Sequence, residues 1–191
     1  KSNIINPTFM PMLQKYIGKP RLKRYLEPNY QVNIDGHIID NTSIYAEDPK
    51  EPFPELVGKG VSVFIENMWR VIETIHASNS KNEDVATYQF LKEHAEDIVF
   101  DHIPVYSSRL RPAIMVAGNL IFDKVNTLFT QIAKCASVLR SFPAVPEGQI
   151  DPSKEKLIYK IQSLNYQVYD HVIRTISGKS GFIRNSLLGN R

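Results

Sequence analysis

The sequence has very little cysteine and no long apolar run. Cys135 is the only cysteine in 191 residues, which excludes an intrachain disulfide and a zinc site built from several cysteines. A single cysteine also fits a reducing compartment without requiring one. Because no stretch of about 18 apolar residues occurs, the sequence predicts no membrane-spanning segment.

A large excess of one charge is missing as well. The 23 Lys and Arg residues nearly balance the 20 Asp and Glu residues, and a net charge of +3 excludes a histone-like polycation. A local basic surface is still compatible with this total. Hydrophobic residues make up 42% and charged residues 23%, which is typical of one folded domain, alone or with an extension. Since the first residue is Lys and no signal-peptide pattern follows, we expect a piece of a longer protein.

The motifs of common active sites are absent from the sequence. There is no GxxxxGK[ST] phosphate loop, no HExxH and no GxSxG. Gly178-Lys179-Ser180 resembles the end of a phosphate loop, but Ile173 stands where the earlier glycine is required. No DxDxD cluster is present to hold magnesium, and the histidines are isolated from further metal ligands. We therefore expect neither catalysis nor a metal site in this chain alone.

The first sixty residues predict short elements separated by prolines. Pro7 and Pro11 on one side and Gly18 on the other limit any first helix to a short one between them. Asp35-Gly36 predicts a two-residue turn between a strand that begins at Tyr30 and a second strand that begins at His37. A basic cluster lies between the helix and the hairpin, and it is either a phosphate-contacting patch or, as the more common alternative, a solvated face; its members are Lys19, Arg21, Lys23 and Arg24.

The middle of the chain predicts two helices, a strand and a turn. Apolar residues recur at steps of three and four over 58–76, and a second helical stretch runs from Val85 to about His94. The β-branched run 97–106 predicts a strand. An irregular loop with Arg109 and Arg111 follows, and 116–119 has the composition of a turn.

The most regular part of the sequence predicts a helical hairpin. Asp123 can cap a helix whose apolar positions are Val125, Leu128, Ile132, Cys135 and Leu139. A second helix, with Pro152 in its first turn, repeats the pattern at Leu157, Ile161, Leu164, Val168 and His171 or Val172. A proline-bearing loop joins them, so the two helices form an antiparallel pair, either packed in a bundle or projecting toward a partner. The predicted fold class is α+β, mostly α.

The C-terminal tail, residues 178–191, combines glycines and cations with apolar residues. Phe182, Ile183, Leu187 and Leu188 are unusual in a free tail, which is normally polar. The mixture suits a segment that packs on a larger body and offers cations to an anionic ligand. These cations are Lys179, Arg184 and Arg191.

Three segments, in order, resemble one protein family. GKSGFIRNSLLGNR (178–191) resembles switch 2 of the β′ subunit of multi-subunit RNA polymerases, which reads GKxGRFRQNLLGKR. IPVYSSRLRP (103–112) is similar to the LPVxPPxLRP of that subunit, and VNTLF (125–129) to the LNxLY that opens its clamp helices. Weaker similarity extends to NPTF (6–9) and GKGV (58–61), so the resemblance covers nearly the whole chain.

The resemblance implies the N-terminal clamp region of a DNA-directed RNA polymerase, a nucleotidyltransferase. It divides the chain into a clamp body (1–115), a lid-like loop (116–122), a clamp-helix hairpin (123–176) and a switch 2-like segment (177–191). Lys179, Arg184 and Arg191 match switch 2 cations that hold the backbone of the template strand. Arg109 and Arg111 are further candidate DNA-binding residues.

The sequence departs from the family pattern at several points, and these differences narrow the expected subgroup of polymerases. The cysteine zinc ribbon of bacterial members is absent, and residues 174–177 leave almost no room for a rudder loop. The first clamp helix is neutral at Thr130, Gln131 and Ala133, which would hold an ordinary sigma factor poorly. The catalytic NADFDGD of the family lies beyond switch 2 and is not in this chain. The chain therefore looks most like the split β′ subunits of large bacteriophage RNA polymerases.

The resemblance also implies partners and a location. We expect contacts with the β subunit and the remainder of β′, a promoter-specificity factor at the helical hairpin, the DNA template and the RNA–DNA hybrid, and no membrane. No cofactor is expected in this chain, and Mg²⁺ is expected in the assembled polymerase. The expected location is the host cytoplasm, with association with the virion as an alternative. The rival hypothesis is a non-catalytic helical-hairpin interaction protein with a basic nucleic-acid-binding tail.

Overall fold

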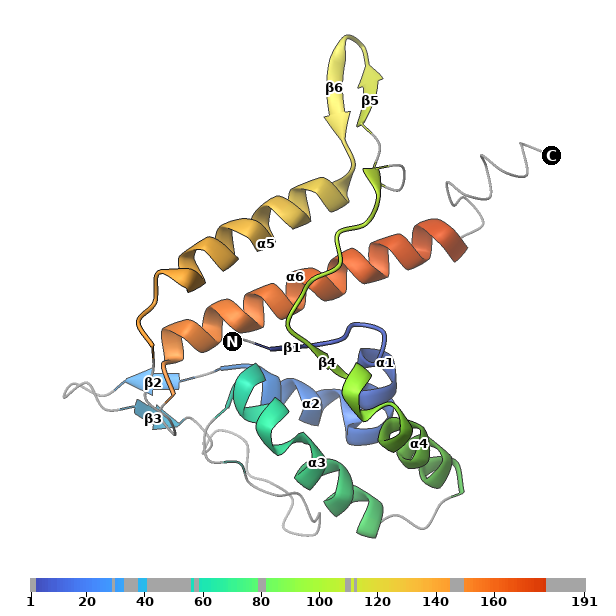
Figure 1. The fold of residues 1–191 in the computed structure, drawn as a ribbon, viewed down its shortest axis with the longest axis vertical. Helices are drawn as coiled ribbons and strands as arrows, with labels where there is room; N and C mark the ends of the chain where they lie inside the picture. The colour runs from blue at the N-terminus through green and yellow to red at the C-terminus, as the bar shows by residue number, and fades with distance from the viewer. Residues whose placement is uncertain are drawn as a thin grey trace. The chain divides into compact units, whose positions relative to one another are not determined.

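The computed structural model describes residues 3–28, 30–32, 38–40, 56, 59–78, 82–108, 111, 113–144 and 150–177. This part of the chain is mostly helical with a few short strands, which confirms the predicted class, α+β and mostly α (Figure 1). The chain divides into two compact units. Unit 1 comprises Lys1–His102 and Phe142–Tyr159, and unit 2 comprises Ile103–Ser141 and Lys160–Arg191.

Unit 1 begins with a short strand and a broken helix. After β1 (Ile4–Ile5) come α1 (Met10–Leu13), a π-helical turn (Gln14–Gly18) and α2 (Lys19–Leu26). The helix predicted to end at Gly18 is present as α1 and the π-helical turn, but α2, which follows directly, was not predicted. Pro20 lies in the first turn of α2, where a backbone N–H would have no intrahelical partner, so the proline is compatible with this helix. Gly18, with a φ of 95°, separates α2 from the preceding turn.

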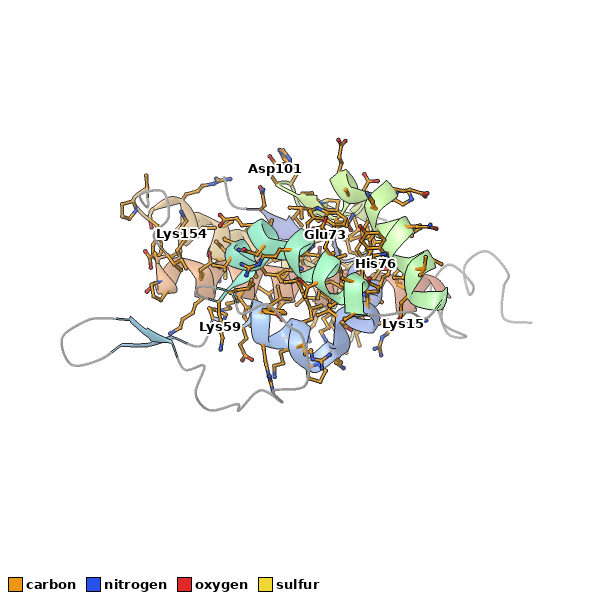
Figure 2. All side chains as sticks on the ribbon, turned by 90° about the horizontal axis from the view of Figure 1, so that it is seen from below. Lys15, Lys59, Glu73, His76, Asp101 and Lys154 are labelled. Atoms are coloured by element: carbon orange, nitrogen blue, oxygen red, sulfur yellow. The ribbon has the colours of Figure 1, made fainter. Side chains whose placement is uncertain are left out.

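Helices α3 (Val61–Ser78) and α4 (Asn82–Glu93) confirm the two helices predicted in the middle of the chain. The core face of α3 is formed by Val61, Phe64, Met68, Val71, Ile72 and Ile75, all buried. His76, labelled in Figure 2, lies on α3 and stacks on the ring of Tyr88 in α4, with ring centroids 3.8 Å apart. This contact makes His76 a packing residue between the two helices.

The strand predicted over 97–106 is much shorter than expected. Ala95–Asp97 form a 3₁₀ turn, and only Val99–Phe100 form a strand, β4, which pairs antiparallel with β1. In this register Phe100 pairs with Ile4, so residues from 101 onward would need partners at or before Asn3. The partner strand is too short to extend the pairing.

The predicted hairpin near residue 35 is confirmed as a pair of strands, but its register differs. Strand β2 (Tyr30–Val32) pairs antiparallel with β3 (Ile38–Asp40), and Val32 lies opposite Ile38. A two-residue turn at 35–36 would have placed Val32 opposite Ile39, so the predicted register is wrong by one residue. The turn and His37 lie outside the described residues.

A buried carboxylate joins the start of α6 to the start of α3 within unit 1. Glu155 is 5% exposed, and its Oε2 accepts a hydrogen bond from the backbone N–H of Ser62 at 3.2 Å. A Cβ on Gly60 would overlap this carboxylate, and Gly60 has a φ of 137°, so glycine is required there on both grounds. The pKa of Glu155 is raised above its ordinary value, mainly because the carboxylate is buried. No local sequence pattern indicates this contact, because Ser62 and Glu155 are 93 positions apart.

Unit 2 contains a β-hairpin and most of two long helices. Strands β5 (Ala113–Val116) and β6 (Asn119–Phe122) pair antiparallel, with Val116 opposite Asn119. The two residues between them, Ala117 and Gly118, have φ values of 48° and 78°, as a type I′ turn requires. The turn predicted over 116–119 is confirmed. Residues 116–122, which the resemblance implies to be a lid-like loop, comprise the end of β5, this turn and β6.

The two predicted long helices are present as α5 (Lys124–Arg140) and α6 (Pro152–Ser177). Pro152 is the first residue of α6, as predicted, and the Asp151 carboxylate caps that helix by accepting from the backbone N–H of Ser153 at 2.9 Å. On α6, Ile158 is buried and Leu157 is only half-buried, so the predicted core position shifts by one residue.

Candidate nucleic-acid interface

Arg111 fastens the loop before the β-hairpin to the first turn of α5. Its Nε donates to the backbone oxygen of Tyr106 at 2.9 Å, and its Nη1 donates to the side-chain oxygen of Asn126. Asn126 returns the contact, because its Nδ2 donates to the backbone oxygen of Arg111 at 3.1 Å. The guanidinium carbon also lies 5.8 Å from the centroid of the Phe129 ring, within cation–π range. We call this arrangement the Arg111–Asn126 clasp.

The clasp engages Arg111, which is one of the five predicted DNA-binding residues. Arg111 is half-buried, and two of its five N–H donors bind groups within unit 2. Its observed contacts therefore hold the loop in place. A phosphate contact by Arg111 would have to use the remaining donors, and it stays a prediction.

Asp123 caps α5, as the sequence predicts, and also marks where α6 passes the start of α5. Its Oδ1 accepts from the backbone N–H of Val125 at 2.8 Å and lies 3.6 Å from Nε2 of His171 on α6. Because Asp123 precedes the first residue of α5 and His171 lies in the last third of α6, the two helices run antiparallel. The predicted helical hairpin is therefore confirmed as a structural element (Figure 1).

The buried residues of these helices in unit 2 are apolar, with two polar exceptions. The buried apolar residues in unit 2 include Val125, Leu128, Ile132 and Cys135 on α5, and Ile161, Leu164, Val168 and Val172 on α6. Gln162 and Asn165 are also buried, with exposures of 2% and 3%. Neither residue is predictable as buried from the sequence, because a single polar residue beside a heptad position normally lies on the surface.

The exposed surface of the helical hairpin is sparsely charged, and most of its charged side chains are cationic. The exposed part of α5 is mostly small and neutral, with Thr127, Thr130, Gln131, Ala133 and Ser137. The charged residues that are exposed on α5 and on residues 160–177 are Lys124, Lys134, Arg140, Lys160 and Arg174. Of these, Arg174 forms an ion pair with Asp170 at 2.9 Å. This surface can attract an acidic partner, although it has fewer charges than a typical phosphate-binding groove.

The basic cluster of residues 19–24 lies on α2. Leu22 and Leu26 are buried, whereas Lys19, Lys23 and Arg24 are exposed. Lys23 Nζ lies 3.8 Å from the Glu27 carboxylate, one helical turn away. This geometry is typical of a solvated helix face with its own ion pair, and it favours that alternative over a phosphate patch.

The remaining predicted DNA-binding residues lie outside the described part of the chain. Arg109, Lys179, Arg184 and Arg191 all fall there, as does the switch 2-like segment beyond Ser177. The structure thus places one of the five candidates, Arg111, and brings it together with Asn126, to which the sequence analysis assigned no role. The signal that could have indicated Asn126 was its position in the VNTLF segment, next to the segment that contains Arg111.

Comparison with known proteins adds no family assignment. No protein-family model matches the chain, and no curated protein gives a significant match. Among the residues that the structure describes, no group of three or more His, Cys, Asp or Glu side chains is arranged to hold a metal ion. None of the described helices is both long and apolar enough to cross a membrane.

Proposed function

We propose that this chain is part of the β′ subunit of a multi-subunit DNA-directed RNA polymerase, and most resembles the split β′ subunits of large bacteriophages. In this role it grips the DNA template and docks a promoter-specificity factor on the helical hairpin. The magnesium chemistry takes place on another part of the assembly, because the family's catalytic aspartates are not in this chain.

The Arg111–Asn126 clasp is the observation that carries the proposal. The two polymerase-like segments, 103–112 and 125–129, were recognised separately, yet one residue from each takes part in a reciprocal hydrogen-bonded contact. Arg111 and Asn126 are both positions at which the sequence matches the family pattern, and the contact between them supports reading the two segments as one unit. In this role the clasp would fix the start of α5 to the loop that precedes the β-hairpin.

The order of elements supports the same proposal. A β-hairpin (113–122), a helical hairpin with an aspartate cap, and a glycine- and cation-containing tail follow one another along the chain. A polymerase clamp has a lid, clamp helices and switch 2 in this order. Lys179, Arg184 and Arg191 would contact template phosphates, which supply affinity without sequence specificity.

The test is RNA synthesis by the native assembly. The full chain, carrying an affinity tag, is purified together with its natural partners and supplied with a double-stranded DNA template and the four nucleoside triphosphates. The proposal predicts Mg²⁺-dependent RNA synthesis that co-purifies with the tagged chain and disappears when the template is omitted. Purification of the chain in a stable complex without any such activity would instead favour the interaction-protein alternative.

A further inference from the structure

The β5–β6 hairpin exposes apolar side chains on both of its faces. Cross-strand pairing places Met115 opposite Leu120, so they share one face with Phe122, whereas Val116 and Ile121 belong to the other face. The exposed fractions of these five side chains are 67%, 53%, 58%, 46% and 47%, in the order in which they are named. No residue between Ala113 and Phe122 carries a charge. An uncharged ribbon of this kind is unfavourable in water on either face.

The hairpin also lacks a further strand among the described residues. Its sheet consists of β5 and β6 alone, so the outer edge of each strand presents unpaired backbone groups. A two-stranded hairpin is at best marginally stable in water without additional packing. Its base is nevertheless held firmly, by the Arg111–Asn126 clasp before β5 and by the Asp123 cap directly after β6. We infer that a further segment covers the ribbon.

The chemistry of the ribbon indicates a polypeptide cover. A surface that binds nucleic acid gains most of its affinity from Lys and Arg side chains that contact phosphates. Residues 113–122 contain none. Apolar side chains and open strand edges instead fit another apolar segment of protein chain.

The C-terminal tail can reach the hairpin. Helix α6 ends at Ser177, six residues after His171, which corresponds to about 9 Å of helix. His171 lies 3.6 Å from Asp123, and Asp123 directly follows the last residue of β6. The tail, residues 178–191, therefore starts near the base of the hairpin. An extended chain spans about 3.3 Å per residue, so the tail is several times longer than a four-residue strand of about 13 Å.

We propose that residues 178–191 dock on the β5–β6 hairpin through Phe182, Ile183, Leu187 and Leu188. Docking would remove apolar side chains of both segments from water. The hairpin has exposed apolar faces, and the tail has apolar side chains that a free terminus would leave in water. The docked tail would keep its cations available for an anionic ligand. The inference goes beyond the polymerase assignment and does not depend on it.

Disulfide trapping in the full chain tests the contact. In a Cys135→Ser background, Leu120→Cys is combined in turn with a cysteine at each of the four apolar tail positions. Because a disulfide needs Cα atoms within about 7 Å, mild oxidation should close an intrachain bond in at least one pair. The matched control combines the same tail substitutions with Thr130→Cys, at an exposed position of α5. The proposal predicts bond formation at least several-fold faster with Leu120→Cys than with Thr130→Cys.

Each alternative cover gives a different result. Equal trapping rates for the two sets would overturn the proposal. Bonds that form only between molecules, at a rate that rises with protein concentration, would show that a second copy covers the hairpin. No trapping by either set would leave a separate polypeptide as the cover and would equally contradict docking of the tail.

Hydrogen exchange provides a second measurement that needs no cysteine. In the full chain, Leu187→Ser combined with Leu188→Ser should speed amide exchange in residues 113–122 by about tenfold or more, while exchange in α3 stays unchanged. The control is Ser186→Ala, which alters the tail without removing an apolar side chain. Unchanged exchange in 113–122 would overturn the proposal, whether or not the chain belongs to a polymerase.

Discussion

Arg111 and Asn126 bind each other reciprocally: the guanidinium donates to the amide oxygen, and the amide nitrogen donates to the backbone oxygen of Arg111. This exchange joins an irregular loop to the first turn of α5. It leaves the two residues mutually dependent, because removal of either one leaves a half-buried polar group without its partner.

A double-mutant cycle measures this dependence. Arg111→Ala and Asn126→Ala should each destabilise the protein, and the double variant should lose less than the sum of the two. The expected coupling is about 1.5–3 kcal/mol, the range for hydrogen bonds to charged groups. Urea unfolding of the four proteins provides the free energies.

The control cycle pairs Arg111 with Thr127 instead of Asn126. Thr127 is an exposed neighbour on the same turn of α5. Arg111→Ala and Thr127→Ala should be additive within about 0.5 kcal/mol. Additivity in the Asn126 cycle as well would remove the clasp as a feature of the folded protein, and with it the main support for the polymerase assignment.

Much of the helical structure could be predicted from the sequence because burial along a helix repeats every three to four residues. This holds for α3, where Phe64, Met68, Ile72 and Ile75 are buried, and for the α5 positions Val125, Leu128 and Ile132. The Asp123 cap was also predictable, since a carboxylate directly before an apolar periodic run satisfies free backbone N–H groups.

Other elements depend on contacts that a local pattern does not contain. Helix α2 was not predicted, because Gly18 and Pro20 lie where it begins and both residue types commonly end a helix. The strand β4 stops early because β1 supplies so few partners. Arg111 and Asn126 are 15 residues apart, and Glu155 and Ser62 are 93 apart, so only the tertiary structure brings either pair together.

The buried Glu155 makes a distinct prediction for the dependence of stability on pH. Its pKa is raised in the folded protein, mainly by burial, so the native state holds this proton more tightly than the unfolded state does. The stability contributed by Glu155 is therefore greatest below its ordinary pKa of about 4.5 and falls as the pH rises through the raised value. In the Glu155→Gln variant the side chain does not titrate, so this pH-dependent contribution to stability is absent.

Urea unfolding at pH 4 and pH 7 tests this sign. The free energy of unfolding of the native protein, minus that of Glu155→Gln, should be smaller at pH 7 than at pH 4. Glu73→Gln, at an exposed position of α3, controls for the loss of one carboxylate. A difference that grows between pH 4 and pH 7 would show that the Ser62 contact outweighs the cost of burying the charge.

The exposed face of α5 carries mostly neutral side chains, and we expect a specificity factor to bind there. Gln131→Glu places a negative charge on this exposed face, and we expect factor-dependent initiation at a promoter to fall about tenfold, which corresponds to about 1.4 kcal/mol. Elongation on a preassembled template–RNA scaffold should be unaffected, because the factor is not needed there.

The matched control is Gln89→Glu, the same chemical change at an exposed position of α4. It should leave both initiation and elongation unchanged. If Gln131→Glu impairs initiation and elongation equally, its effect is on folding or assembly, and the docking surface lies elsewhere.

The central claim is that the cations of the tail hold template phosphates, and the salt dependence of DNA binding tests it most directly. Each phosphate contact contributes about 0.9 to the slope of log K against log salt concentration. Replacement of Lys179, Arg184 and Arg191 with Ala should therefore reduce the magnitude of the slope by about 2.7. The control variant, with Arg70, Lys92 and Lys156 replaced with Ala, changes the net charge equally at exposed positions of α3, α4 and α6 and should retain most of the native slope. A slope that is unchanged in the tail variant, or reduced equally in both variants, would contradict the account.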